Sequence, residues 1–256
     1  MKGITGITVF DGKSKLNNDD IIVVATLNSE NVKTGNLVQT WILPKNISPL
    51  VAVNLGKDSS TCACNLRGYL REQYHNVGGI VGITHKTTTN KSRVCYVSTF
   101  SAPQAVWHKF HRGEYPFLDQ NNQKLLSGRK IRLSSVGDPS AVPSKVWKKL
   151  LSLSIGWTGY THNWKNGQNR HLKSFCQAST NLVEETKLAW SLGWKTFRIS
   201  KDNKPLQGEI VCPASKHKVK CEQCMLCNGQ RVNVMIKIHG TKGKIAAFNQ
   251  LIKEPK

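Results

Sequence analysis

Four cysteines gathered in one short stretch are the residues best suited to chemistry. Cys212, Cys221, Cys224 and Cys227 lie within sixteen residues, and the last three follow a C-x2-C-x2-C spacing. Thiolates at this spacing can converge on one metal centre, because a tight loop turns each sulfur inward. Both tetrahedral zinc and a cubane iron–sulfur cluster take four such ligands. The stretch therefore predicts a bound metal or cluster.

The choice between the two centres rests on the spacing. The uninterrupted C-x2-C-x2-C run is closer to ferredoxin spacing than to the two separated knuckles of a zinc ribbon, so it favours a 4Fe-4S cluster, with zinc as the alternative. Two disulfides, or four unrelated buried thiols, are the other interpretations. A short loop with little core of its own needs a centre to fold around, which favours metal.

A second group of cysteines lies earlier in the chain. Cys62 and Cys64 are two residues apart, so in an extended segment both side chains point the same way. Cys95 would be brought in by the fold, and Cys176 is a possible fourth ligand. These residues predict a second metal site. The alternative is that they are small buried apolar side chains, as free cysteines often are.

The charge of the chain indicates a polyanionic partner. Its 256 residues carry 37 Lys and Arg against 15 Asp and Glu, a formal charge of +22. Nucleic acid is the usual partner of so basic a protein. An anionic membrane surface, a small acidic substrate, or a solvated surface with no partner are the alternatives. The candidate nucleic-acid-binding residues are Lys33, Trp107, Lys109, Arg112, Tyr160, Trp164, Lys201 and Lys242.

Four of these candidates lie in two stretches that have a second interpretation. Aromatic and basic residues interleave around Trp107 and Tyr115, which suits base stacking beside phosphate contacts. The same pattern is typical of an amphipathic helix with an aromatic inner face. Lys33 belongs to the stretch NVKTGN over residues 31–36, which could hold a phosphate or could form a plain hairpin turn.

The pattern of apolar residues predicts an α/β fold. Residues 1–60 contain short β-branched runs, including DIIVVATL and LVQTWIL, and from residue 129 strands and helices alternate. Such alternation favours a mainly parallel sheet. One of these predicted helices, SKVWKKLLSLS, carries Val146, Trp147, Leu150 and Leu151 on one face. We expect a partial (β/α) barrel with a β-rich N-terminal segment and a cysteine-rich metal loop. The N-terminal region covers 1–128 and the barrel-like region 129–256, packed as one compact unit.

Ligands of parallel sheets bind at the C-terminal ends of the strands. Asp138, His162 and Arg198 each follow or end a predicted strand, so we expect them to share a pocket near a metal centre. They would supply a carboxylate and an imidazole for proton transfer and a guanidinium that grips phosphate. The structural alternative is that Asp138 caps a helix, His162 bonds to backbone, and Arg198 pairs with Glu184 or Glu185. The sequence also predicts a helix capped by Asn181, with Glu184 three residues on completing an approximate capping box.

Several stretches together resemble a family of phage and plasmid proteins called gene-product-88-like. They are NVKTGNLVQTWIL, the CAC and CY cysteines, SSVGDPSAVPSKVW, GWTGYTHNW, SLGWKTFRI and the 212–229 loop. The resemblance implies a mobile-element origin and a cysteine-rich architecture, and it supplies no reaction. The barrel with a cluster also looks like radical SAM enzymes, although their C-x3-C-x2-C run is missing here.

These observations combine into one functional expectation. The chain has no run of about 20 apolar residues that could span a bilayer and no secretory signal, so we expect a cytoplasmic protein. It would be an iron–sulfur or zinc protein of a phage or plasmid that binds nucleic acid and processes or modifies it. The alternative is a non-catalytic replication or host-takeover factor whose metal is purely structural.

Overall fold

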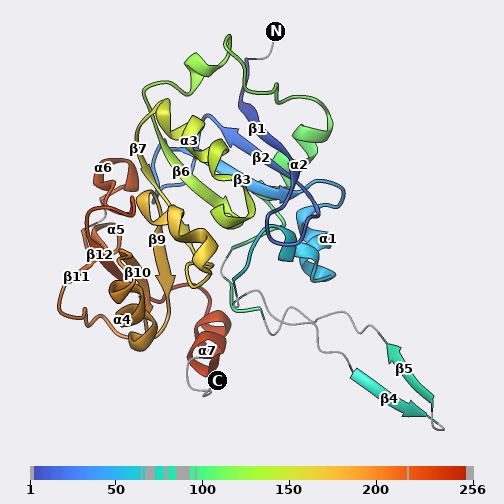
Figure 1. The fold of residues 1–256 in the computed structure, drawn as a ribbon, viewed down its shortest axis with the longest axis vertical. Coiled ribbons are helices and arrows are strands. Elements are labelled where there is room, and N and C mark those ends of the chain that lie inside the picture. The colour runs from blue at the N-terminus through green and yellow to red at the C-terminus, as the bar shows by residue number, and fades with distance from the viewer. Residues whose placement is uncertain are drawn as a thin grey trace.

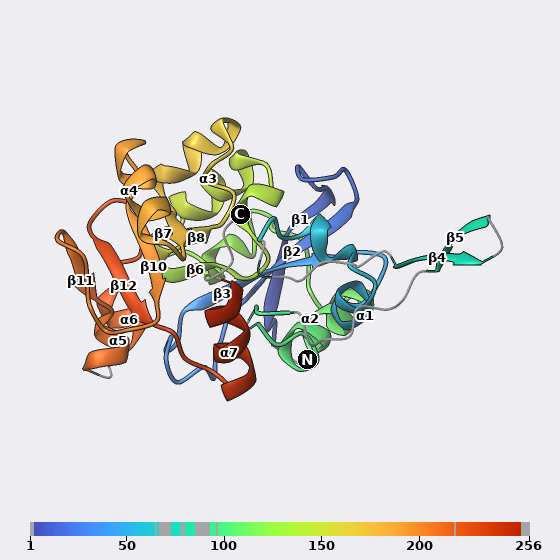
Figure 2. The same cartoon turned by 90° about the horizontal axis from the view of Figure 1, so that it is seen from below.

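The computed structural model describes residues 3–64, 66, 73–77, 80–84, 93–95, 97–217 and 219–251. These residues form a mixed α/β fold built on two five-stranded sheets and one separate hairpin (Figure 1). The hairpin, β4 (Gln73–Val77) and β5 (Ile80–Thr84), extends away from the sheets in both ribbon views (Figures 1 and 2). None of the described helices is long and apolar enough to cross a membrane.

The first sheet is mixed and begins at the N-terminus. Three antiparallel strands come first, as the β-branched runs predict, and two parallel strands extend the sheet. In spatial order these strands are β1 (Gly6–Lys13), β2 (Asp20–Thr26), β3 (Val38–Pro44), β6 (Arg129–Val136) and β7 (Ser154–Thr158). Because β3 pairs with β6, this sheet joins the segments before and after residue 128.

The second sheet is parallel throughout. In spatial order its strands are β11 (Glu209–Val211), β12 (Asn233–Lys237), β10 (Thr196–Ser200), β9 (Gln177–Thr180) and β8 (Tyr160–Thr161). Over the described residues, the two sheets do not close into a barrel.

The sheets meet at Gly159, the single residue between β7 and β8. Its amide donates to the carbonyl of Cys227 at 2.8 Å, so the cysteine loop takes the place of a sheet hydrogen bond. A Cβ at this position would lie 3.0 Å from Cys176 Sγ and 3.2 Å from Leu133 Cδ1. Glycine is required here because the backbone of one strand approaches its neighbours too closely for a side chain.

Seven α-helices are described (Figure 1). They are α1 (Pro49–Asn54), α2 (Ala102–His111), α3 (Ser144–Ser152), α4 (Val183–Ser191), α5 (Pro213–Lys216), α6 (Cys221–Cys224) and α7 (Lys242–Leu251). Short 3-10 turns cover Lys57–Ser60, Gln123–Leu125, Pro139–Ala141 and Gly167–Ser174.

Helix α3 illustrates how the sequence builds the main core. Trp147 and Leu150 lie on one face of the helix and are fully buried in the same cluster as Ile131 and Leu133 of β6. The Trp147 indole also donates to the carbonyl of Pro139 at 2.9 Å, which satisfies its only polar atom. The apolar face predicted from the sequence is thus the face that packs.

Helix α4 starts differently from the prediction. The helix begins at Val183 with Leu182 as its N-cap, and no capping side chain bonds at that position. Glu185, not Glu184, reaches back to accept from the amide of Asn181 at 3.2 Å. The predicted Asn181 cap was therefore wrong, because the polar contact is made by a first-turn carboxylate instead.

Candidate functional site

The inner faces of the two sheets enclose a cavity of about 380 Å³. Side chains alternate along each strand. On β6, Ile131 and Leu133 enter the main core while Arg132 lines the cavity, and on β10, Phe197 and Ile199 line it. Both cysteine groups also reach its wall: Cys62, Cys64, Cys95, Cys212, Cys221, Cys224 and Cys227.

The C-x2-C-x2-C run folds as a single helical turn followed by a reversal. Helix α6 spaces Cys221 and Cys224 three residues apart, which places both on one side of the turn. Met225 then adopts a left-handed conformation with φ 49° and turns the chain so that Cys227 returns toward the sheet. Cys212 directly follows β11 and shares an apolar cluster with Cys227. All eight cysteines of the chain are free thiols.

The stretch over residues 31–36 is a docking site for this cysteine turn. The amide of Cys221 donates to the carbonyl of Lys33 at 3.0 Å, and the amide of Glu222 to that of Thr34 at 3.1 Å. The Glu222 carboxylate in return accepts from the amide of Asn36 at 2.6 Å. Gly35 has φ +70° and lies against that carboxylate, so a side chain there would collide. The stretch therefore holds the cysteine turn with its backbone.

Contacts on the other side join the cysteine loop to the beginning of β6 and to the end of β7. Lys130 Nζ donates to the carbonyl of Glu222 at 2.7 Å, and the Trp157 indole to that of Asn228 at 3.2 Å. The sequence predicts that the loop shares the C-terminal edge of the sheet with Asp138 and His162. In the structure Cys212 directly follows β11 at that edge, and the contact between Lys130 and Glu222 also brings the loop to the beginning of β6.

Electrostatic interactions link the four sulfurs of this loop. Burial raises the pKa of Cys227 to about 12; a hydrogen bond with Tyr160 opposes the shift, and the other three cysteines add to it. Burial also raises the pKa of Cys221, against the effect of Arg132 and Lys33. Four thiolates brought together would repel one another in the absence of a cation. The donor set therefore fits a metal or cluster, because thiolate ligation supplies that cation.

The side-chain geometry is not that of an assembled mononuclear site. Within the described residues, no three His, Cys, Asp or Glu side chains are grouped closely enough to hold a metal ion. The four-cysteine assignment therefore rests on the loop path, on its burial and on the chemistry of the donors.

The second cysteine set lies at the other end of the cavity. The amide of Cys64 contacts Cys62 Sγ at 3.4 Å, and the hydrogen bond between these thiols, followed by burial, raises the pKa of Cys62 well above its ordinary value. Burial also raises the pKa of Cys95; the charge of Arg93 opposes this shift, and Cys62 reinforces it. Cys176 does not line the cavity and is fully buried in the main core.

Asp138 and His162 are brought together at this second end. The amide of Asp138 donates to the carbonyl of Thr61 at 2.7 Å, next to Cys62. The Asp138 carboxylate is 1% exposed and accepts from the amide of Ser140, the hydroxyl of Thr161 and the amide of His162. The carboxylate thus holds the turn after β6 against the end of β8. The His162 side chain lies on the cavity wall.

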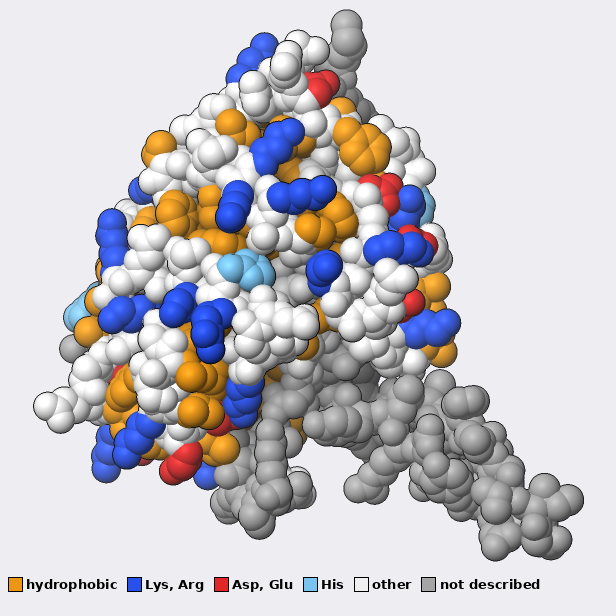
Figure 3. All heavy atoms as spheres, in the orientation of Figure 1, with side chains coloured by type: hydrophobic (Ala, Val, Ile, Leu, Met, Phe, Trp, Pro, Cys, Tyr) orange, Lys and Arg blue, Asp and Glu red, His pale blue; other side chains and the backbone are white. Residues whose placement is uncertain are grey.

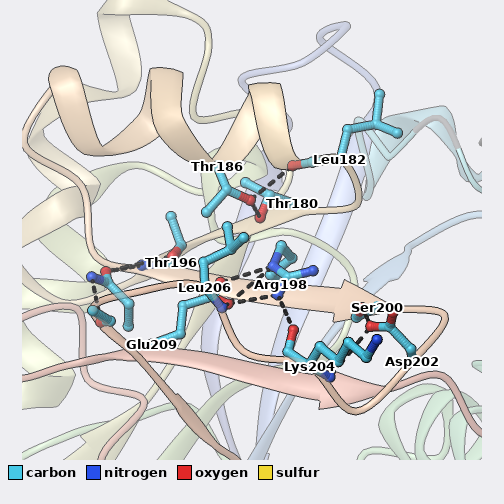
Figure 4. A network of polar contacts seen from close by, with 12 residues as sticks. Thr180, Leu182, Thr186, Thr196, Arg198, Ser200, Asp202, Lys204, Leu206 and Glu209 are labelled. Atoms are coloured by element: carbon cyan, nitrogen blue, oxygen red, sulfur yellow. Dashed lines mark hydrogen bonds and ion pairs between the residues drawn. The ribbon is translucent and has the colours of Figure 1, made fainter.

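Arg198 lies on the opposite face of its strand. Its guanidinium donates to the Glu209 carboxylate from Nε at 2.8 Å and from Nη2 at 2.6 Å, and to the carbonyl of Lys204 at 3.1 Å (Figure 4). It does not line the cavity that Asp138 and His162 reach. The structure therefore does not bring the three predicted catalytic residues together, and the partner of Arg198 is Glu209 rather than Glu184 or Glu185.

The two tryptophans among the candidate nucleic-acid-binding residues make structural contacts. The Trp107 indole on α2 donates to the carbonyls of Pro44 and Lys45, which fixes the helix against the end of β3. Trp164 is 3% exposed, and its indole donates to the carbonyl of Ser179 at 3.0 Å. The Trp164 ring is therefore too buried to stack on a base, and Trp107 is half-buried.

The remaining candidates are spread between surface and cavity. Tyr160 lies in the cavity and stacks on Phe197. Arg112 is exposed and pairs with Glu114 at 2.6 Å. Three of the candidate lysines are exposed, namely Lys33, Lys201 and Lys242, and Lys109 is half-buried. Lys and Arg side chains outnumber acidic ones on the face drawn in Figure 3.

Sequence reasoning missed several residues of the cavity wall. Arg132 and Phe197 both line the cavity and were not predicted as site residues. The signal was present for the two strand residues, because alternation places Arg132 opposite Ile131 and Phe197 opposite Arg198. No protein-family model matches the chain, and comparison with curated proteins and with solved structures finds no match.

Proposed function

We propose that the chain is a metal-centre protein that binds nucleic acid. Its centre, a 4Fe-4S cluster or alternatively zinc, is held by Cys212, Cys221, Cys224 and Cys227. The observation that carries this proposal is that all four cysteines line one cavity, where burial, reinforced by the other three cysteines, raises the pKa of Cys227 to about 12. A centre bound there would supply electron transfer if it is iron–sulfur, or structural cross-linking if it is zinc.

Nucleic-acid binding is supported by the charge of the molecule. Seven acidic side chains form ion pairs in the described part of the chain, so much of the small acidic complement is already neutralised. The formal charge of +22 then leaves a large basic excess on the surface. Phosphate contacts by such a surface weaken steeply as salt rises, because each neutralised phosphate releases counterions.

We interpret the two sheets as a partial (β/α) barrel that runs through Gly159 from one sheet to the other and stays open at the edge strand β11. In this interpretation the cavity is the barrel interior, and Cys62, Cys64 and Cys95 offer a second, three-thiol site. Three protein ligands leave a position for a substrate, whereas four close a structural site. An enzyme would use the three-cysteine end with His162; a purely binding protein would need the four-cysteine end alone.

Metal analysis of a matched pair of variants tests the centre. Cys224→Ala removes a half-buried proposed ligand, and Cys176→Ala removes a buried thiol that lies outside the cavity. After anaerobic purification we expect iron with inorganic sulfide, or zinc, in the parent and in Cys176→Ala, and a loss of at least half in Cys224→Ala. A parent free of all three elements, or equal loading in both variants, would refute the centre.

A further inference from the structure

The cavity carries a basic excess that its cysteines do not explain. Its wall holds five Lys and Arg side chains and two aspartates, namely Lys33, Arg93, Arg132, Lys237, Lys244, Asp58 and Asp138. Asp58 forms an ion pair with Arg93 at 2.7 Å, and the Asp138 carboxylate is engaged in three hydrogen bonds. Lys and Arg side chains thus outnumber carboxylates on the cavity wall, and this excess favours an anionic occupant.

Two of the nitrogen groups meet across the gap between the cysteine turn and the end of β12. Lys33 Nζ lies 3.2 Å from His239 Nε2, and both side chains reach the cavity. Burial and the nearby ammonium lower the pKa of His239, so the neutral ring accepts from the lysine. An anion at this position would accept a hydrogen bond from Lys33 and would stabilise the protonated form of the His239 ring. Such a pair suits a phosphate group.

An aromatic pair lies on the same cavity wall. The rings of Tyr160 and Phe197 are 4.6 Å apart between centroids, with an interplanar angle of 55°. Ile199, Val234 and Ile236 from β10 and β12 also line the cavity with apolar surface. Aromatic side chains of this kind stack on nucleobases of any sequence. The wall therefore suits a planar ring, and the lysine–histidine pair suits an anionic group.

We propose that the cavity binds one nucleoside phosphate, with its base against Tyr160 and Phe197 and its phosphate at Lys33 and His239. A volume of about 380 Å³ lies at the small end of the range of ligand pockets, about 300–1,000 Å³, and suits a single nucleotide. The nucleotide is either free or one unit of a bound strand. Only the second source rests on the proposed nucleic-acid binding.

Calorimetric titration of the full chain with adenosine monophosphate, adenosine and inorganic phosphate tests the site. We expect one binding event for the monophosphate, tighter than for either fragment. Lys33→Gln should weaken it about 10-fold or more, as expected for loss of a charge-assisted hydrogen bond. The backbone carbonyl of Lys33, rather than its side chain, docks the cysteine turn, so this variant should keep its fold. Phe197→Leu should weaken binding about 5-fold or more through lost stacking.

Lys148→Gln is the matched control, because Lys148 is an exposed cation on the outer helix α3. It should leave monophosphate binding unchanged. Absence of monophosphate binding, equal weakening by Lys33→Gln and Lys148→Gln, or binding no tighter than that of inorganic phosphate would overturn the proposal.

Two further measurements separate this proposal from the proposed function. Metal content measured on every variant shows whether Lys33→Gln affects the cysteine centre. If this variant loses metal but keeps its affinity for the monophosphate, the proposed role of Lys33 in nucleotide binding would be overturned. A short single-stranded oligonucleotide that competes with the monophosphate identifies a strand as the source, and simultaneous binding identifies the free nucleotide. Monophosphate binding by a metal-free protein would support the cavity site while refuting the metal centre.

Discussion

Replacing Glu209 with alanine tests whether Arg198 is structural. The Glu209 carboxylate accepts from two guanidinium nitrogens of Arg198 and from the amide of Leu206 at 2.8 Å (Figure 4). The two charged side chains are 6% and 0% exposed. The substitution would leave a buried guanidinium that keeps its hydrogen bond to the carbonyl of Lys204 but loses its carboxylate partner. It would also release β11, the strand that leads into Cys212.

The expected loss follows from burial. Removing one partner of a buried ion pair costs about 3–5 kcal/mol, whereas an exposed pair contributes about 0–1 kcal/mol. Urea unfolding should therefore show a large decrease in the free energy of unfolding for Glu209→Ala. Glu114→Ala is the matched control, because its pair with Arg112 is 41% and 58% exposed. The control should lose less than about 1 kcal/mol.

A double variant completes the test. Arg198→Met with Glu209→Leu replaces the pair by apolar side chains of similar size and should recover most of the stability lost by Glu209→Ala, as buried pairs often allow. A cost for Glu209→Ala as small as that for Glu114→Ala would refute a buried structural pair. Failure of the double variant to recover stability would refute the attribution of the loss to an uncompensated charge.

Three further predictions concern single positions. Gly159→Ala should lower the free energy of unfolding by about 1–3 kcal/mol, because its Cβ would lie 3.0 Å from Cys176 Sγ; an unchanged thermal midpoint would contradict this close fit. Trp107→Phe should lower the free energy of unfolding by about 0.5–1.5 kcal/mol, because the hydrogen bond to the Pro44 carbonyl is lost, and should leave nucleic-acid affinity unchanged. A variant that keeps its full stability but loses affinity would support base stacking by Trp107 instead. Burial raises the pKa of Tyr115 from 10.0 to about 12. The contribution of this shift to the free energy of unfolding is therefore complete below pH 10 and is lost as pH rises toward 12. Denaturation at alkaline pH should show this loss of stability, and Tyr115→Phe should remove the pH dependence.

The sequence predicts local elements well where one face of the element is apolar. The runs that became β2 and β3, and the helix containing Trp147 and Leu150, follow directly from residue periodicity. Their burial then follows because each apolar face needs a partner. The mixed α/β class follows from the same alternation.

The path of the cysteine loop could not be predicted in this way. Its position depends on backbone hydrogen bonds to Lys33, Thr34 and Gly159, which come from distant parts of the chain and leave no periodic signal. The side of the sheet on which Arg198 lies was readable, because Phe197 and Ile199 alternate with it. Its partner was not, since Glu209 lies on β11, on the other side of β12.

X-ray absorption spectroscopy at the iron and zinc edges of the anaerobically purified chain tests the central claim most directly. The account predicts a metal surrounded by four sulfurs, at about 2.3 Å for zinc–thiolate ligation, or by sulfurs with a further iron shell for a cluster. The signal should be reduced in Cys224→Ala and retained in Cys176→Ala. A metal bound only by nitrogen and oxygen, or no metal signal in the parent, would contradict the account.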